Sequence, residues 1–197
     1  MQKSFSEVES TLGRLLQSTL EQTLGACKPS STWNCSRAES LDELPFEQCI
    51  VLTISSFRFK LMCLLHMNMD ETNRQFVADA LHIKRSELGE DAYTDYLLEM
   101  SNSFCGTLKR HMQSSCPPLG MSTPNFLHRA CLAIEHAQPP RHSAHARCRD
   151  NQGNTALFAA SILVFSSQAE DFQLQHYKEY VRDSNDEADA SGELELF

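Results

Sequence analysis

The sequence predicts an α+β fold in which long helices pack against one mostly antiparallel sheet. Two segments, Ser4–Leu24 and Leu88–Gln113, carry apolar residues three or four positions apart, which is typical of helices with one buried face. Several short runs rich in β-branched and aromatic residues follow one another closely enough for hairpins. Because strands and helices come in blocks and do not alternate regularly, an α+β layer structure is favoured over a parallel α/β sheet.

The first third of the chain contains one helix and one hairpin. We expect the helix Ser4–Leu24 to end at Gly25. The segment Ala26–Pro45 is rich in serine, proline and charge and is predicted to be a loop. The runs Cys49–Ile54 and Phe57–Met67 are separated by two serines and predict an antiparallel hairpin.

Two helices and a strand are predicted in the middle of the chain. Asp70 is a suitable N-cap for a helix that continues to about His82. The longer helix Leu88–Gln113 is followed by Cys116-Pro117-Pro118, which a helix cannot continue through. The alternation of apolar and polar residues over Asn125–Ile134 predicts a strand.

The last part of the chain is predicted to contain a second hairpin and a helix. Gln138–Arg141 contains two prolines and should turn, and Ser143–Arg149 and Asn154–Ser166 should pair with each other. Residues Ala169–Arg182 have helical apolar spacing. The remaining residues 183–197 form an acidic tail that we expect to be disordered.

Length and charge limit the possible functions. A chain of 197 residues fits one domain over residues 1–182, followed by the tail. The tail contains six acidic residues and no basic one, so it accounts for most of the net charge of −9. No basic cluster suited to nucleic acid or to anionic lipid is present. No apolar run approaches the length of a membrane span, and the first residues are too polar for a signal peptide, so a cytoplasmic protein is expected.

Eight cysteines raise the question of disulfides. No two of them form a C-x-x-C pair, and three lie in apolar runs that predict strands. In a chain without a signal peptide this pattern predicts buried, reduced thiols. The positions are Cys27, Cys35, Cys49, Cys63, Cys105, Cys116, Cys131 and Cys148.

The long helix Leu88–Gln113 has a narrow polar ribbon opposite its apolar face. At about 100° per residue, the ribbon holds two carboxylates, an amide and a glycine, namely Asp95, Glu99, Asn102 and Gly106. The opposite side is apolar and consists of Leu97, Met100, Phe104 and Leu108. From geometry alone, an ordinary solvated helix face is the favoured explanation of the ribbon, because most charged helical faces are only solvated.

The residues of this ribbon resemble a known family signature. The octapeptide D-Y-L-L-E-M-S-N (Asp95–Asn102) is similar to the motif of the CheC/CheX/FliY family of chemotaxis phosphatases, which is Asp or Ser, three residues, Glu, two residues and Asn. The flanking residues fit this resemblance: S-F-C-G follows the motif, and strand-like and proline-containing segments surround its helix. This chain has one copy of the motif whereas CheC has two, so the resemblance is closest to the CheX branch. The segment Ala26–Pro45 is longer than is usual in the family, and the last 30 residues have no counterpart in the family pattern.

The resemblance implies a CheX-like fold and a specific activity. The expected substrate is the aspartyl phosphate of a CheY-type response regulator, whose own acidic pocket supplies magnesium, so that this chain needs no metal or other cofactor. By resemblance Asn102 would orient the attacking water, and Glu99 would pair with the active-site lysine of the regulator. Asp95, Ser103 and Gly106 would contact the partner.

Two other functions remain open at this point. The same fold could serve as a non-catalytic adaptor that binds response regulators or assembles with the flagellar switch. The residues His142-x-x-His145-x-x-Cys148 are of types that bind zinc, although spacing of three on a strand places the two histidines on opposite faces.

CheX-like relatives suggest a homodimer with exchanged strands. Asn154–Ser166 is long and apolar, and as an exposed sheet edge it would promote aggregation unless a second subunit covered it. Pro139-Pro140 could be the hinge for such an exchange. The alternative is that this strand is central within one subunit and that the protein is monomeric.

Overall fold

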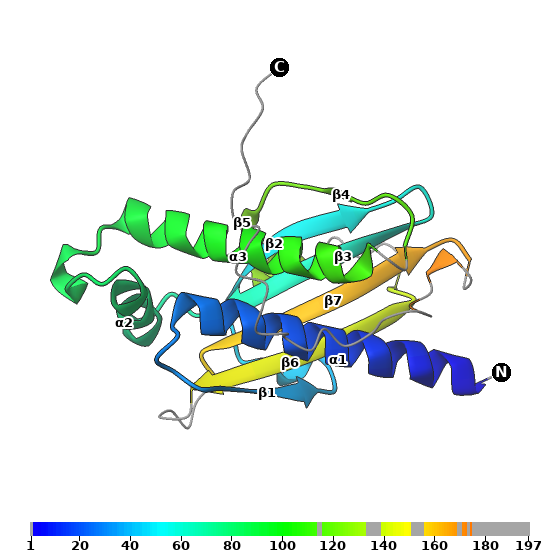
Figure 1. The fold of residues 1–197 in the computed structure, drawn as a ribbon, viewed down its shortest axis with the longest axis horizontal. Coiled ribbons are helices and arrows are strands. Elements are labelled where there is room, and N and C mark those ends of the chain that lie inside the picture. Colours follow the sequence, from blue (N-terminus) through cyan, green and yellow to red (C-terminus); the bar gives the residue numbers. More distant parts are fainter. Residues whose placement is uncertain are drawn as a thin grey trace, which may run out of the picture.

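The computed structural model describes residues 2–113, 116–132, 139–150, 156–168, 171, 172 and 174. It shows one seven-stranded sheet with three α-helices. Figure 1 shows the two long helices lying side by side across the same face of the sheet. This arrangement confirms the predicted α+β class, with helices packed on an antiparallel sheet.

The helices are α1 (Gln2–Cys27), α2 (Glu71–Ala80) and α3 (Glu90–Met112), so all three lie where the sequence predicts helices in this part of the chain. Asp70 caps α2 as expected, because its Oδ1 accepts a hydrogen bond from the Asn73 amide at 2.9 Å. Short 3₁₀ turns occur at Leu41–Glu43, Arg85–Glu87 and Arg129–Cys131.

The strands pair in the order β1-β6-β7-β3-β2, and both β4 and β5 pair with β2 at the far edge. Every pairing is antiparallel. The bounds are β1 Trp33–Ala38, β2 Gln48–Ser55, β3 Phe59–Met67, β4 Gly120–Met121, β5 Asn125–His128, β6 His142–Asp150 and β7 Phe158–Ser166. Both predicted hairpins are therefore confirmed as strand pairs.

Two local predictions are wrong, and two others fall mainly outside the described residues. The predicted loop Ala26–Pro45 contains strand β1, which pairs with β6. The strand predicted over Asn125–Ile134 stops at His128, after which the chain turns into a 3₁₀ helix. The helix predicted at Ala169–Arg182 falls almost wholly outside the described residues, and the acidic tail falls entirely outside them.

Strand β7 lies in the interior of the sheet, between β6 and β3. Its residues pair with His142–Cys148 on one side and with Phe59–His66 on the other. The expectation that it forms an exposed edge is therefore wrong, and the alternative of a central strand holds. The strand needs no second subunit to satisfy its backbone hydrogen bonds.

The two faces of the sheet are covered differently. The helix side contains the main core, where leucines of α1 and the apolar residues of α3 meet alternate residues of β2, β3, β6 and β7. On the opposite face, Leu44, Phe46 and Leu132 pack over a smaller set of strand residues. This second face also contains a buried polar row in which Ser161 Oγ lies 2.9 Å from His66 Nε2 and 2.8 Å from His145 Nδ1.

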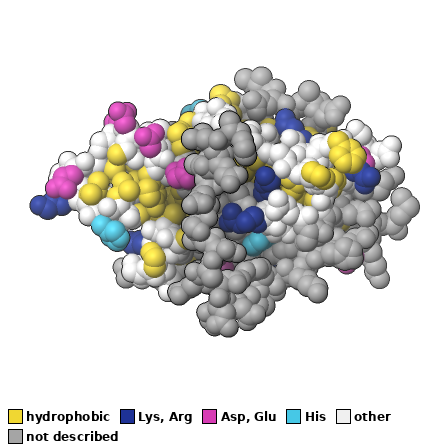
Figure 2. Space-filling model, turned by 45° about the horizontal axis from the view of Figure 1, so that its top comes forward, with side chains coloured by type: hydrophobic (Ala, Val, Ile, Leu, Met, Phe, Trp, Pro, Cys, Tyr) yellow, Lys and Arg dark blue, Asp and Glu magenta, His cyan; other side chains and the backbone are white. Residues whose placement is uncertain are grey.

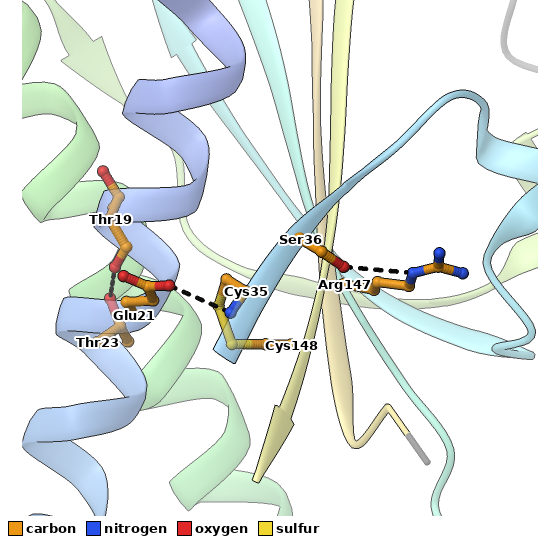
Figure 3. The surroundings of a disulfide bond; sticks show 7 residues. All are labelled: Thr19, Glu21, Thr23, Cys35, Ser36, Arg147 and Cys148. Atoms are coloured by element: carbon orange, nitrogen blue, oxygen red, sulfur yellow. Dashed lines mark hydrogen bonds between the residues drawn. A yellow bond between two sulfur atoms is a disulfide. The ribbon is translucent and has the colours of Figure 1, made fainter. Parts of the chain in front are cut away.

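The prediction that all cysteines are reduced is wrong for one pair. Cys35 and Cys148 form a disulfide between β1 and β6 (Figure 3). The sequence pattern could not indicate it, because the two residues are 113 positions apart and only the sheet pairing brings them together. The other six cysteines form no disulfide.

No helix within the described residues is both long and apolar enough to cross a membrane.

Candidate functional site on helix α3

Helix α3 is fixed at its start by contacts with α2. Arg74 forms an ion pair with Glu90 (2.8 Å) and lies over the Tyr93 ring, 4.4 Å from its centroid. The Tyr93 hydroxyl donates a hydrogen bond of 2.9 Å to Asn73 Oδ1 inside the protein. Burial raises the pKa of Tyr93 to about 12, so the hydroxyl keeps its proton and remains a donor at neutral pH.

The charges at the two ends of α3 match the helix dipole. Glu90 and Asp91 occupy the first turn, and Lys109, Arg110 and His111 occupy the last. Acidic residues in the first turn and basic residues in the last turn each stabilise a helix by a few tenths of a kcal/mol to about 1 kcal/mol. The helix is therefore stabilised independently of the polar residues at its centre.

The apolar side of α3 packs into the core as predicted. Leu97, Met100, Phe104 and Leu108 are all at most 3% exposed. This anchors the rotation of the helix about its axis, because turning it by one residue would expose two or more of these side chains. The opposite side of the helix must consequently face outward.

We call the outward residues Asp95, Glu99, Asn102, Ser103 and Gly106 the α3 ribbon. Asp95, Glu99 and Ser103 are exposed, whereas Asn102 and Gly106 are half-buried. Glu99 and Asn102 are three positions apart on one helix, so their side chains are neighbours. The structure thus brings all five predicted site residues onto one accessible face.

Gly106 is not required by packing within this chain. A methyl group placed on it would have Arg110 Nη1 as its nearest neighbour, at an ordinary contact distance of 3.8 Å. The chain's own residues therefore do not require a glycine at this position.

A groove of about 490 Å³ runs beside the ribbon, between α3 and the end of α1. Glu99, Ser103 and Arg110 line it from α3, while Thr23 and Cys27 line it from α1. Burial raises the pKa of the Cys27 thiol, so Cys27 is a neutral wall of the groove and not a nucleophile. The sequence did not reveal the groove or Arg110, since both depend on how two helices far apart in the chain pack together.

The alternative zinc residues do not form a site. Cys148 is bonded to Cys35 and is not available as a thiolate ligand. His145 points to Ser161 on the second face of the sheet, whereas His142 stacks near Phe172, with ring centroids 6.2 Å apart. Among the residues that the structure describes, no group of three His, Cys, Asp or Glu side chains could hold a metal ion.

Comparison with solved structures identifies the fold. A CheC-like superfamily protein from Shewanella sp. PV-4 aligns with a TM-score of 0.57 and 12% identity, covering 79% of this chain and 97% of that one. The chemotaxis protein CheX from Vibrio vulnificus aligns with a TM-score of 0.55 and 14% identity, covering 77% and 99%. The chain has a CheX-like fold.

The CheX-like fold extends over nearly the full length of these relatives. A complex of CheX with CheY, BeF₃ and Mg²⁺ from Borrelia burgdorferi also aligns, with a TM-score of 0.53, 9% identity and coverage of 74% and 97%. No protein-family model and no curated protein matches the sequence. The similarity thus lies in the fold, and the chemistry of this chain must be argued from its own residues.

Proposed function

We propose that this protein hydrolyses the aspartyl phosphate of a CheY-type response regulator. One observation carries the proposal: a Glu-x-x-Asn pair, Glu99 and Asn102, lies on the outward face of a rigidly packed helix in a CheX-like fold. A CheX of the same fold forms a complex with CheY, BeF₃ and Mg²⁺. The outward position leaves both side chains accessible to a protein substrate.

Asn102 is suited to orienting water. A carboxamide offers both a donor and an acceptor in one plane, so it can hold a water molecule without taking up its proton. In the proposed step the water oxygen attacks phosphorus, and the bond from phosphorus to the aspartyl oxygen breaks. The aspartate leaves as a carboxylate, and both protons of the water leave with inorganic phosphate.

The half-buried position of Asn102 favours this role over that of a freely rotating surface amide. Positioning accounts for much of the acceleration in such reactions, because the phosphoryl bond is already reactive and little covalent help is needed. The magnesium ion in this proposal belongs to the regulator, where it neutralises charge on the phosphoryl oxygens.

Glu99 is proposed to anchor the regulator. Its exposed carboxylate lies one turn before Asn102 and would pair with the lysine of the regulator's active site. Asp95 and Ser103 extend the contact along the same face, and Gly106 allows the partner backbone to approach. All of these residues come from one helix, so each copy of the chain carries a complete ribbon.

Phosphate release from a panel of phosphorylated CheY-type regulators tests the proposal. Asn102→Ala should slow the accelerated release by about two orders of magnitude, since a water displaced by roughly 1 Å is poorly placed for attack. Glu99→Ala should mainly raise KM. Asn34→Ala, an exposed asparagine on β1, is the matched control and should behave like the unmutated protein.

The outcome also separates catalysis from adaptor function. If the Glu99→Ala/Asn102→Ala double variant accelerates release as well as the unmutated protein, the site assignment is wrong. If the unmutated protein binds a phosphorylated regulator without accelerating its hydrolysis, the protein is an adaptor.

A further inference from the structure

Arg110 is held in a defined position beside the α3 ribbon. Its Nη2 donates a hydrogen bond of 2.8 Å to Thr107 Oγ1, and Thr107 is itself buried. Its Nη1 lies 3.8 Å from the point where a side chain of Gly106 would begin. The guanidinium is therefore folded back along the helix toward the glycine, while Arg110 as a whole remains exposed.

This position brings the charge close to Asn102. Gly106 follows Asn102 by one helical turn, and the Cβ positions of residues four apart are about 5–6 Å from each other. A guanidinium resting over Gly106 is thus about one turn from the Asn102 side chain. Any side chain larger than that of glycine would occupy part of the space between them.

Arg110 and Glu99 also line the same groove, with opposite charges. They are separated by eleven residues, or about 16 Å along the helix axis. Figure 2 shows acidic side chains together with a basic one toward the left of the drawn face, and several basic side chains nearer its middle. The site therefore presents carboxylates at one end and a cation at the other.

We propose that Arg110 is a second anchor of this site, which binds an anionic oxygen of the partner next to Asn102. This inference rests on the proposed function and extends it. A guanidinium can donate two parallel hydrogen bonds to a phosphoryl group or to a carboxylate. The bond to Thr107 uses Nη2 of Arg110, so other N–H groups of the guanidinium can donate to such an anion. The anion is either the phosphoryl group itself or an acidic side chain at the rim of the regulator's active site.

A purely structural role for Arg110 makes a different prediction. A basic residue in the last turn of a helix stabilises the dipole wherever its side chain points. In that case replacing Arg110 would lower stability slightly and leave binding unchanged.

Binding and kinetics with a CheY-type regulator distinguish these roles. Affinity for the regulator treated with beryllium fluoride and magnesium should fall about tenfold in Arg110→Ala, which corresponds to the loss of one charge-assisted hydrogen-bonding contact. Arg110→Lys should recover only part of this affinity. Thr107→Val, which removes the acceptor that holds the guanidinium, should weaken binding less than Arg110→Ala does.

Two control variants each remove a positive charge at another position and leave the Arg110 guanidinium and its bond to Thr107 in place. Arg14→Ala acts on an exposed position of α1, and Lys109→Ala acts on the neighbouring residue of α3. A loss equal to that of Arg110→Ala in either control means that general charge attraction is responsible, and this would overturn the proposal. Unchanged affinity and unchanged KM in Arg110→Ala would overturn it as well.

The unphosphorylated regulator identifies the anion. If Arg110→Ala weakens only the beryllofluoride form, Arg110 binds the phosphoryl group, and if it weakens both forms equally, Arg110 binds a carboxylate. Either result supports the anchor. Failure of the proposed function is recognised separately, as binding without phosphate release by the unmutated protein, and the affinity measurements on Arg110 still apply in that case.

Discussion

Cys35 and Cys148 stand directly opposite each other in the antiparallel ladder of β1 and β6, with their Cα atoms 4.1 Å apart, and they are joined by a disulfide. Strand β1 is the edge strand on this side of the sheet. Figure 3 shows the bond beside α1, where Glu21 Oε1 accepts a hydrogen bond of 3.1 Å from the Cys35 amide. The disulfide thus secures the edge strand next to the helix that covers it.

Removal of this disulfide should destabilise the protein. We expect Cys35→Ala/Cys148→Ala to lower the free energy of unfolding by about 2–4 kcal/mol, because the closed loop in the unfolded chain is long. Urea unfolding without reductant measures the change. Cys131→Ala removes an exposed free thiol and should leave stability nearly unchanged. Labelling of all eight cysteines in the denatured, unreduced protein would show that the bond does not form.

Stability should depend on pH through the buried histidines. Burial, the nearby positive charge of Arg129 and His145 together lower the pKa of His66 to about 3, and burial also lowers the pKa of His145. The unfolded chain binds a proton near pH 6.5, whereas folded His66 does not until about pH 3. Since the unfolded state binds more protons in this interval, stability falls as pH decreases from 6.5 toward 3.

Each such histidine contributes a slope of at most about 1.4 kcal/mol per pH unit. We expect the loss of stability between pH 7 and pH 5 to be smaller by about 1–2 kcal/mol in His66→Gln, which stays neutral and can still bond to Ser161. The control is His82→Asn, at an exposed position with φ of 57° that asparagine tolerates. Equal pH dependence in the two variants would contradict the assignment.

Gly106→Ala should separate stability from function. Space for a methyl group exists, and alanine exceeds glycine in helix propensity by up to about 1 kcal/mol, so the variant should unfold at a higher urea concentration. If Gly106 serves partner approach, affinity for the regulator should nevertheless fall several-fold. Gly13→Ala on α1, where no atom lies within 4 Å of an added methyl, should gain stability without losing affinity. Full affinity in Gly106→Ala would remove the glycine from the proposed contact surface.

The homodimer expected from the sequence remains a prediction, but its original reason is gone. Because β7 is central, a dimer that joins two sheets edge to edge would have to form through β1 or through the β4 and β5 edge. Light scattering at micromolar concentration decides between a mass near 22.3 kDa and one twice as large. A monomer would show that a second subunit is not needed to complete the fold.

Elements with strong local patterns could be predicted from the sequence. The apolar spacing along α1 and α3, the Asp70 cap and the β2–β3 hairpin depend on residues close together in the chain, and the structure confirms all of them. Strand β1 was missed because only its two end residues, Trp33 and Ala38, are buried, and its partner strand begins more than 100 residues later. Local periodicity carries no information on such a pairing.

The candidate site also has one part that the sequence could predict and another that depends on tertiary packing. Helical geometry places four residues of the α3 ribbon, Asp95, Glu99, Asn102 and Gly106, on one face from the sequence alone, whereas Ser103 came from the family resemblance. The groove beside it and the held position of Arg110 depend on the packing of α1 against α3 and on a hydrogen bond to Thr107. The spacing of residues in the sequence could therefore predict neither the groove nor the position of the Arg110 side chain.

The central place of β7 has a consequence for how the chain folds during synthesis. The strand is the last of the described strands to be made, yet both halves of the sheet pair with it. Until it emerges, the β2–β3 hairpin and the apolar side of α1 have no complete sheet on which to pack, and they remain exposed as a partly folded nascent chain. The sheet is therefore completed only once β7 has paired, and contacts of such long sequence separation slow folding. A folding helper that covers apolar surface would act on this chain before β7 has paired with β6 and β3.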